Sequence, residues 1–390
     1  MRVCFFTYNL FGLGGIQRVL SVVANSLCDD YEVFIQCYDN ESDENRELYN
    51  LNSKIKVIFI KPCSGNYFRK VLRKFNQKTA VLEKINSKRI FDYSYLIPTE
   101  QDMYVKVIKE YKIDVAIGVG AFESYMLGSV APVVNCKTIG WQHSSYKAYF
   151  ETAGAHCWGM GNSVDRYLKQ LDAYVVLNEY DGKQLWNKKG VKTKTIYNPK
   201  SFESDTVSKL NKKTFISAGR FIPLKGYDLL IEAFSKFAIN NKEWNLEIYG
   251  TGPQYKELEK KIKDYHLEQR IKLLGFTNNI KEKMLNASCY VLSSRWEGMP
   301  MTVLESLELG LPVIAFDITA MRPLVQDGKE GIIVDAFDTA KLAEAMEKIS
   351  ESSLTRKAMG VAARDKAKLF AIDNIKKQWD QILKEKGENS

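Results

Sequence analysis

Two glutamates lie on either side of a short turn in the stretch RWEGMPMTVLESLELGLPVIAFD, residues 295–317. Glu297 precedes a Gly-Met-Pro turn, and Glu305 follows it in a segment with helical spacing. A helix that begins after this turn offers unpaired N–H groups and a partial positive charge, which suit an anion such as a diphosphate. The carboxylate of Glu305 can accept hydrogen bonds from the two hydroxyls of a ribose, and that of Glu297 from hydroxyls of a sugar. This pattern favours a nucleotide-sugar site; the alternative is that both are solvated residues at a helix start.

Two cations come from the stretch AGRFIPLKG, residues 218–226. Arg220 suits a forked contact with a phosphate, and Lys225 suits a point-charge contact. The next predicted strand ends in the turn YGTGPQ, where Gly250 lets the backbone approach a base or a phosphate. Each signal is weak alone, and together they favour diphosphate binding.

The sequence contains no Asp-x-Asp triplet, so the usual carboxylate clamp for a metal-bound diphosphate has no obvious ligands. We therefore expect that no metal or other cofactor is required. The charge of a leaving diphosphate would be met by Arg220, Lys225 and the helix start, as electrostatic stabilisation by preorganised groups.

The elements that must position these residues alternate between apolar strands and helical segments, which is typical of parallel sheets covered by helices. In the first half, strands are predicted at 2–8, 31–38, 55–60, 114–120, 136–142 and 173–178, with a helix at 16–28. In the second half, strands are predicted at 214–219, 246–250, 271–275, 289–294, 312–316 and 331–335, and helices near 226–240, 253–265, 278–286, 302–309, 338–350, 353–369 and 373–387. Two doubly wound α/β sheets are therefore expected, with ligands at the carboxyl ends of their strands.

A polar stretch at 200–213 has little to bury and marks the predicted domain junction. We expect an N-terminal Rossmann-like domain over 1–198 and a C-terminal one over 199–370. The closing segment 371–390 is expected to form a helix that packs back toward the N-terminal domain.

Read in order, these motifs resemble the family-4 retaining glycosyltransferases, also called glycosyl transferases group 1, which have the GT-B fold. The resemblance is carried by Gly219-Arg220 with Lys225-Gly226, IYGTGP, IKLLGF, the E-x7-E pair in EGMPMTVLE, LGLPVIAFD, FGLGGIQRV (11–19), WQH (141–143) and IYNP (196–199). It spans nearly the whole chain. It implies a nucleotide-sugar donor held mainly by the C-terminal domain and an acceptor held mainly by the N-terminal one.

The resemblance also assigns roles to individual residues. Those that it assigns to catalysis are Glu297, His143, Arg220 and Lys225. Those that it assigns to donor binding are Gly14, Gly15, Gly250, Gly298, Met299, Pro300, Met301, Thr302 and Glu305. In this assignment the diphosphate is neutralised by the two cations, the ribose is held by Glu305, and the transferred sugar faces His143 and Glu297. Met299 stands where many members have Phe, and Trp141-Gln142 before His143 also departs from other members, so sugar specificity stays open.

The stretch NYFRKVLRKF, residues 66–75, predicts an amphipathic helix. One predicted face carries Tyr67, Phe68, Val71, Leu72 and Phe75, and the other carries Arg69, Lys70, Arg73 and Lys74. Such a helix can dock on an anionic bilayer and present a lipid-linked acceptor. The alternative is a helix that covers the domain and exposes a solvated basic back.

Composition sets the remaining bounds. The 390 residues are 45% hydrophobic and carry a net charge of +9, and no apolar run reaches the roughly 20 residues of a membrane span. We therefore expect a cytoplasmic protein, in which peripheral attachment to the plasma membrane stays open. The seven cysteines are scattered and are expected to be reduced core thiols. Nucleic-acid binding would rest on charge alone, because no basic motif with interleaved aromatics is present.

The prediction is a retaining glycosyltransferase that moves a hexose or N-acetylhexosamine from a UDP-sugar to a lipid-linked glycan in bacterial surface-polysaccharide assembly, such as capsule or lipopolysaccharide. By resemblance, the acceptor hydroxyl attacks on the face from which the phosphate leaves, and that phosphate takes the proton. The alternatives are a transferase with a soluble acceptor and a catalytically idle GT-B scaffold.

Overall fold

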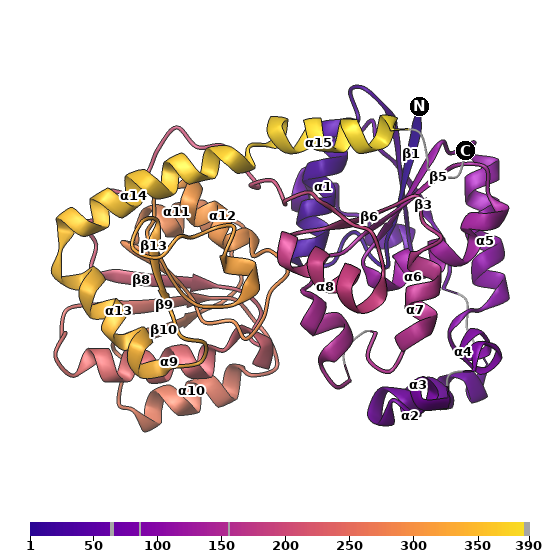
Figure 1. The fold of residues 1–390 in the computed structure, drawn as a ribbon. Coiled ribbons are helices and arrows are strands. Elements are labelled where there is room, and N and C mark those ends of the chain that lie inside the picture. The colour runs from indigo at the N-terminus through magenta and orange to yellow at the C-terminus, as the bar shows by residue number, and fades with distance from the viewer. Residues whose placement is uncertain (63–65, 86, 155–156, 386–390) are drawn as a thin grey trace. The chain divides into compact units, whose positions relative to one another are not determined.

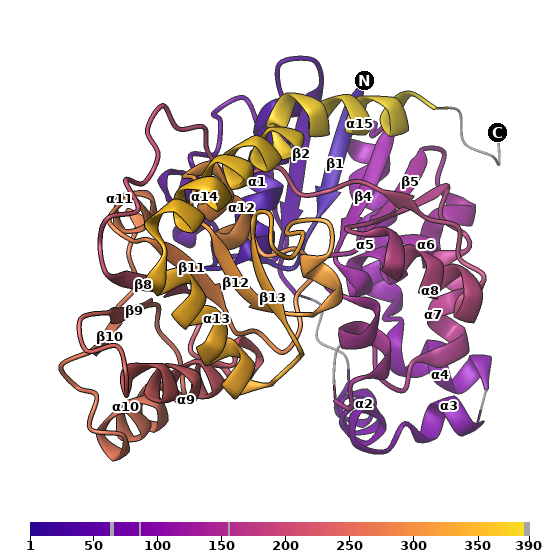
Figure 2. The same cartoon turned by 60° about the vertical axis from the view of Figure 1, so that its left-hand side comes forward.

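The computed structural model describes residues 1–62, 66–85, 87–154 and 157–385. In this part of the chain the strands form two parallel sheets, one of seven strands and one of six (Figures 1 and 2). The chain divides into two compact units. Unit 1 comprises Met1–Pro199 and the segment that starts at Ile372, and unit 2 comprises Lys200–Ala371.

The sheet of unit 1 has the strand order β3-β2-β1-β4-β5-β6-β7. Its strands are β1 (Arg2–Phe6), β2 (Glu32–Cys37), β3 (Lys56–Phe59), β4 (Val115–Val119), β5 (Lys137–Trp141), β6 (Ala173–Val176) and β7 (Lys194–Thr195). In the centre of the sheet, Val3 pairs with Val33 on one side and with Val115 on the other. The central strands are buried on both faces, which explains their nearly continuous apolar sequences.

Helices cover this sheet and fill the connections. They are α1 (Gly15–Leu27), α2 (Tyr67–Thr79), α3 (Val81–Ile85), α4 (Lys88–Tyr95), α5 (Pro98–Glu110), α6 (Ala121–Val130), α7 (Gly161–Leu168), α8 (Glu179–Lys189) and α15 (Ile372–Lys384), with a π-helical turn at Lys147–Glu151 and 3-10 turns at Glu41–Asp43, Arg46–Tyr49 and Ala131–Val133. The last helix, α15, packs on α1, and the hydroxyl of Tyr31 donates a 2.8 Å hydrogen bond to Asp380.

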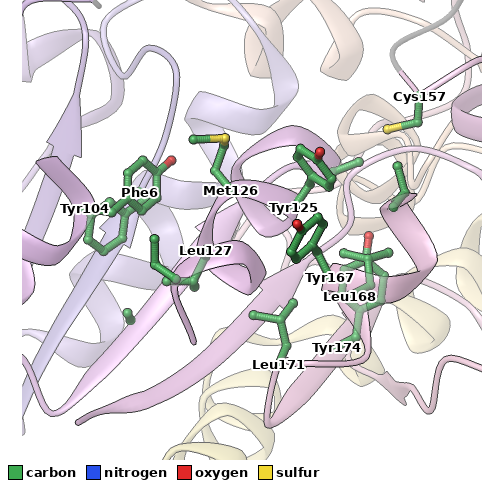
Figure 3. Close-up of a cluster of buried hydrophobic side chains, with 14 of the residues drawn as sticks. Phe6, Tyr104, Tyr125, Met126, Leu127, Cys157, Tyr167, Leu168, Leu171 and Tyr174 are labelled. Atoms are coloured by element: carbon green, nitrogen blue, oxygen red, sulfur yellow. The ribbon is translucent and has the colours of Figure 1, made fainter. Parts of the chain in front are cut away.

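One core cluster of unit 1 contains several aromatic side chains that contact one another (Figure 3). Phe6 of β1 stacks on Tyr104 of α5 with ring centroids 4.5 Å apart, and Tyr125 of α6 meets Tyr167 of α7 edge to face at 5.3 Å. Because such rings bury large apolar areas and stack in defined geometries, they fix α5, α6 and α7 against the sheet.

The sheet of unit 2 has the order β10-β9-β8-β11-β12-β13. Its strands are β8 (Thr214–Ala218), β9 (Asn245–Tyr249), β10 (Ile271–Leu274), β11 (Cys289–Leu292), β12 (Val313–Phe316) and β13 (Gly331–Val334). Phe215 pairs with Leu246 on one side and with Cys289 on the other. In both sheets the strand order reverses direction once, between β1 and β4 and between β8 and β11, and ligands of such sheets bind beyond the carboxyl ends of the strands at these points.

The helices of unit 2 are α9 (Tyr227–Ala238), α10 (Tyr255–Asp264), α11 (Ile280–Leu285), α12 (Met301–Glu308), α13 (Thr339–Glu351) and α14 (Ser353–Ala367), with 3-10 turns at Pro223–Lys225, Thr319–Met321 and Lys368–Phe370. Local sequence signals explain several of their ends. The side chain of Asp338, for example, accepts hydrogen bonds of 3.0 Å from the N–H groups of Ala340 and Lys341 and so starts α13. The predicted α/β class with two doubly wound sheets is confirmed.

Segment 66–75 forms a helix, α2, as predicted. Its basic face is partly turned inward, which does not fit the alternative of a domain-covering helix with a solvated basic back. Arg69 donates a 2.6 Å hydrogen bond to the carbonyl oxygen of Leu96, and Arg73 donates one of 2.6 Å to that of Ser94. These carbonyls end α4, where the last turn lacks intrahelical donors, and the two guanidinium groups supply them. The aromatic side chains of Tyr67, Phe68 and Phe75 on the other face are exposed.

The cysteines behave as expected within the described residues. Cys4, Cys28, Cys37, Cys157 and Cys289 are buried free thiols, and Cys136 is a partly buried one. Burial raises the pKa of the Cys37 thiol to about 12, so this thiol stays protonated. Cys63 lies outside the described residues.

Candidate functional site

An ion pair lies beyond the carboxyl ends of β8 and β11, where the order of the unit 2 strands reverses. The ammonium group of Lys225 lies 2.6 Å from a carboxylate oxygen of Glu297. The hydroxyl of Ser294 donates to the same oxygen at 2.6 Å. The residues that the resemblance assigns to the diphosphate and to the transferred sugar thus contact each other. Both side chains are largely buried, which excludes the alternative of a solvated Glu297.

The loops that carry this pair are bound to each other by residues that the sequence analysis missed. Arg295 makes a forked contact with Asp228, with distances of 2.9 and 2.7 Å. Burial acts to raise the pKa of the Asp228 carboxyl, but the hydrogen bonds from Arg295 outweigh it and hold that pKa below its ordinary value. The Arg295 N–H also donates to the Leu224 carbonyl oxygen at 2.8 Å. These contacts hold the loop that carries Lys225 and the loop that carries Glu297 against each other.

A glycine allows the close contact between these loops. Gly226 has φ of 63°, and a Cβ there would collide with the carbonyl oxygen of Ser293. The Ser293 hydroxyl in turn donates to the Lys225 carbonyl oxygen at 2.9 Å. Gly226 thus meets two needs that only glycine meets, a left-handed backbone and the absence of a side chain.

Arg220 lies two residues after the end of β8, and its surroundings differ from those of Lys225. Its side chain is exposed and forms no ion pair among the described residues. It is therefore a cation available to a ligand. Gly250 follows β9, and a Cβ there would collide with the Gly219 carbonyl oxygen. The close approach predicted at Gly250 is thus made by the protein's own backbone.

Helix α12 begins directly after Pro300. Among the described residues, no side chain caps this helix, and its first turn holds no acidic residue. Its first N–H groups therefore keep the capacity to bind an anion. The hydroxyl of Tyr290 donates to that of Thr302 at 2.6 Å and fixes the first turn on β11. Met299 and Met301, on either side of Pro300, are buried.

Glu305 lies in α12 and has no exposed surface. The hydroxyl of Ser201 donates to its carboxylate. A buried carboxylate is expensive unless it is hydrogen-bonded, so the position is built for this group. The alternative of a solvated Glu305 at a helix start is excluded.

In unit 1, Gly14 and Gly15 follow β1 and begin α1. The Gly14 N–H donates to the hydroxyl of Tyr49 at 2.9 Å. Gly15 is exposed, and a Cβ there would meet no atom within 4 Å. The described residues provide no side-chain cap for α1, so its N-terminus can also receive an anion.

His143 follows β5 and is buried. Desolvation lowers its pKa to about 3, so the imidazole is neutral at pH 7. Its ring lies 4.2 Å from that of Trp141, which in turn meets Trp379 of α15 edge to face at 4.8 Å. Its Nε2 is buried and has no hydrogen-bond partner among the described residues. Such a nitrogen suits a hydrogen bond with a ligand hydroxyl and does not suit charge neutralisation.

The structure thus gathers the predicted residues at one edge in each unit. In unit 2 these are Arg220, Lys225, Glu297 and the start of α12; in unit 1 they are Gly14, Gly15 and His143. Arg69 and Arg73 belong to the α2–α4 contact instead. The ion pair between Arg295 and Asp228 was not predicted. Arg295 lies close to the motif EGMPM and could have been noticed, but nothing in the sequence indicates that Asp228 is its partner.

No three His, Cys, Asp or Glu side chains among the described residues come together as metal ligands. No helix in the same residues combines the length and apolar character needed to cross a membrane.

Comparison with known proteins identifies the family. Residues 200–366 match the family model described as Glycosyl transferases group 1. An uncharacterized glycosyltransferase of Haemophilus influenzae is 26% identical over 98% of this chain and 99% of its own. An α-1,4-N-acetyl-D-galactosaminyltransferase of Campylobacter jejuni, whose name gives a PP-undecaprenol-linked acceptor, is 26% identical over 99% of both.

A solved structure supports the fold. Anabaena HepE in complex with UDP-glucose superimposes with a TM-score of 0.75, at 16% identity, over 98% of this chain and 99% of that one. The two parallel sheets and the family match over 200–366 agree with the prediction of fold and enzyme class. Residues 200–366 thus match the glycosyl transferases group 1 family, and the chain is a retaining glycosyltransferase with the GT-B fold.

Proposed function

We propose that this glycosyltransferase moves a hexose or N-acetylhexosamine from a UDP-sugar to a lipid-linked glycan during the assembly of a bacterial surface polysaccharide. One observation carries the donor half of the proposal. The Lys225–Glu297 pair, with a 2.6 Å contact, lies beside the uncapped start of α12, at the strand ends where such sheets bind ligands. The UDP-glucose complex of HepE supports the choice of nucleotide.

In unit 2, different residues bind the diphosphate, the transferred sugar and the ribose of the donor. Arg220 and the first N–H groups of α12 bind the diphosphate and stabilise the charge that develops as it leaves. Lys225 adds a second cation once its contact with Glu297 is shared with the ligand. Glu297 accepts hydrogen bonds from hydroxyls of the transferred sugar, and Glu305 accepts them from the ribose.

The acceptor half rests on unit 1. Tyr8, which is 66% exposed, follows β1, and its ring lies 5.9 Å from that of Tyr38, which follows β2. Aromatic rings combine a flat apolar face with a polar end, which suits the faces of a sugar. The lipid-linked acceptor in the name of the Campylobacter relative supports a similar acceptor here.

The neutral His143 adds a hydrogen-bonding group without charge. In this proposal its buried Nε2, which has no hydrogen-bond partner among the described residues, contacts a hydroxyl of the transferred sugar. Trp141 packs on the ring and is itself packed on Trp379. The reaction needs no nucleophile from the protein, because the acceptor hydroxyl attacks and the departing phosphate takes its proton.

The test is a mass-spectrometric screen of the purified protein against a panel of nucleotide-sugars for slow donor hydrolysis. The expected result is hydrolysis of one or two UDP-sugars, and transfer when a diphosphate-linked lipid acceptor is added. Glu297→Gln should lower turnover about 10- to 150-fold, because it removes a charged hydrogen-bond acceptor. Glu259→Gln, at an exposed ion pair with Lys263, is the matched control and should change little.

The alternatives have their own outcomes. Equal transfer to a water-soluble glycan without detergent or vesicles would replace the lipid-linked acceptor by a soluble one. Absence of hydrolysis and of transfer with every donor would indicate an idle scaffold.

A further inference from the structure

One side of α2 exposes large apolar side chains. Tyr67, Phe68, Val71 and Phe75 have exposed fractions of 83, 59, 43 and 55%. At helical spacing these four positions follow one stripe along the helix. Exposed apolar residues that occur singly are ordinary, but four in one stripe form a contiguous patch, which typically marks an interaction site. We call this stripe the α2 face.

The opposite side of α2 is fixed, so the helix cannot turn its rings inward. The buried side chain of Asn76 donates to the hydroxyl of Tyr95 and to the Gly159 carbonyl oxygen, both at 2.9 Å, and accepts from the Leu82 N–H at 2.9 Å. The two arginine contacts with the end of α4 lie on this side as well. Rolling the helix would leave these groups buried without partners.

The patch continues onto α4. Phe68 lies 6.3 Å from Tyr93, measured between ring centroids, and Tyr93 is 40% exposed. The Arg69 guanidinium lies 4.5 Å from the centroid of the Tyr93 ring. Ile90, one turn earlier on the same helix, is 39% exposed. The apolar surface therefore extends over two helices.

Lysines flank the α2 face. Lys70, Lys74 and Lys78 are exposed, and none pairs with an acidic side chain in the part of the chain that the structure describes. From 61 to 95 the sequence holds nine Lys or Arg and two Asp or Glu, a net charge of +7, whereas the whole chain carries +9. Most of the excess positive charge of the protein thus lies in the sequence segment that contains α2 and α4.

A stripe of aromatic rings with lysines along its border is the arrangement of helices that lie in a bilayer interface. The rings enter the boundary between headgroups and acyl chains, and the lysine stems let their ammonium groups reach the phosphates. We propose that the α2 face docks on an anionic bilayer. Tyr67, Phe68, Val71 and Phe75 insert, and the three lysines bind headgroup phosphates.

The position of α2 within unit 1 fits a lipid-linked substrate. Figures 1 and 2 both show α2 at the end of unit 1 opposite the N-terminus, where β1 starts, and therefore on the side of the strand carboxyl ends. Gly15 and His143 lie at these strand ends. Docking of the α2 face is argued from α2 and α4 alone. Only the statement that the lipid of the acceptor lies in the same membrane rests on the proposed function.

The experiment measures sedimentation of the full chain with vesicles, in the absence of donor and acceptor. Vesicles of phosphatidylcholine with phosphatidylglycerol are compared with pure phosphatidylcholine. Phe68→Ser with Phe75→Ser should lower the partition coefficient at least tenfold on both kinds of vesicle. Lys70→Gln, Lys74→Gln and Lys78→Gln together should remove the preference for anionic vesicles, by about fivefold for each charge.

Matched controls exist on unit 2. Leu354→Ser with Val361→Ser removes two apolar side chains of α14 that are 78 and 66% exposed, and should leave vesicle binding unchanged. Lys256→Gln with Lys260→Gln removes two exposed charges of α10 and should also leave vesicle binding unchanged. Circular dichroism and turnover on a water-soluble acceptor confirm that the α2 variants are folded.

The proposal is overturned if the ring variant binds vesicles as the wild type does, or if anionic and neutral vesicles bind equally. It is also overturned if the wild type self-associates with rising concentration and Phe68→Ser with Phe75→Ser abolishes this, because a second copy then covers the α2 face. High salt should weaken binding to anionic vesicles without abolishing it, since screening leaves the apolar part. Vesicle binding without sugar transfer would contradict the proposed function and leave the membrane surface standing.

Discussion

Protonation of His143 provides a direct test of the site in unit 1. Burial lowers the pKa of this imidazole from 6.5 to about 3. In the unfolded chain the imidazole binds a proton below pH 6.5, whereas in the folded protein it does not until about pH 3. The unfolded state therefore binds more protons between these values, and stability falls as the pH falls. At about 1.4 kcal/mol for each pH unit, the loss is about 2 kcal/mol between pH 6.5 and pH 5.

His143→Gln removes this contribution while keeping a side chain that can form hydrogen bonds. Urea unfolding of the wild type and the variant at pH 7.5 and pH 5 should show the variant gaining about 2 kcal/mol relative to the wild type on acidification. The comparison matters because Glu123, whose pKa is raised to about 7 by burial, acts in the opposite direction: its contribution falls as the pH rises from 4.5 to 7. Both proteins contain Glu123, so its effect cancels.

The titration itself can be observed by NMR, since the sequence holds three histidines. The imidazole resonance that disappears in His143→Gln should keep its chemical shift from pH 8 to pH 5. A midpoint near 6.5 for this resonance would refute the reasoning, because it would mean that the ring is solvated and not packed against Trp141. An equal pH dependence of stability in both proteins would refute it in the same way.

Four further predictions follow from the site. Glu305→Gln should weaken UDP binding about 10- to 150-fold by calorimetry, and an unchanged affinity would remove Glu305 from the ribose site. Turnover should survive EDTA, and complete loss that manganese or magnesium restores would show a required metal. Arg295→Lys, which loses the forked contact with Asp228, should lower kcat/KM about tenfold, and so should Asp228→Asn. The double variant should lose little more than either single variant, whereas additive losses would show that the two residues act independently. Tyr8→Ala should raise the KM for the acceptor without changing donor hydrolysis, and an effect on hydrolysis alone would place Tyr8 outside the acceptor site.

The sequence was sufficient to predict every strand of the two sheets except β7, and the edge at which the candidate donor residues of unit 2 lie. Parallel strands are buried on both faces, so their apolar runs are long and bounded by turns, as with CYVLSS before Glu297. Because the strands are parallel, residues that follow them lie at one edge, and this places Arg220, Lys225 and Glu297 together. The ion pair between Lys225 and Glu297 could not be predicted, because it depends on how two loops pack through Gly226 and Ser293.

The orientation of α2 shows where sequence periodicity fails. The periodicity of 66–75 separates an apolar face from a basic one but does not say which faces the protein. That choice is made by α4, whose final carbonyl groups need donors, and Arg69 and Arg73 supply them. A helical wheel contains no information about this partner, so the sequence alone left both orientations open. The arginines should therefore contribute to the packing of α2 on α4, while the lysines remain available at the surface.

Helix α15 has a consequence for synthesis on the ribosome. Unit 1 is discontinuous in sequence: its last helix, Ile372–Lys384, is translated after all of unit 2. Until then Trp141 lacks the Trp379 ring, and Lys137 lacks the carbonyl oxygens of Ile382 and Glu385, to which it donates at 2.5 Å. Unit 2 can therefore complete its core first, although its sequence comes second. The sheet behind His143 reaches its final packing only once Ile372–Lys384 has been translated, so a nascent or truncated chain that lacks this helix carries an exposed apolar seam for chaperones and proteases to recognise.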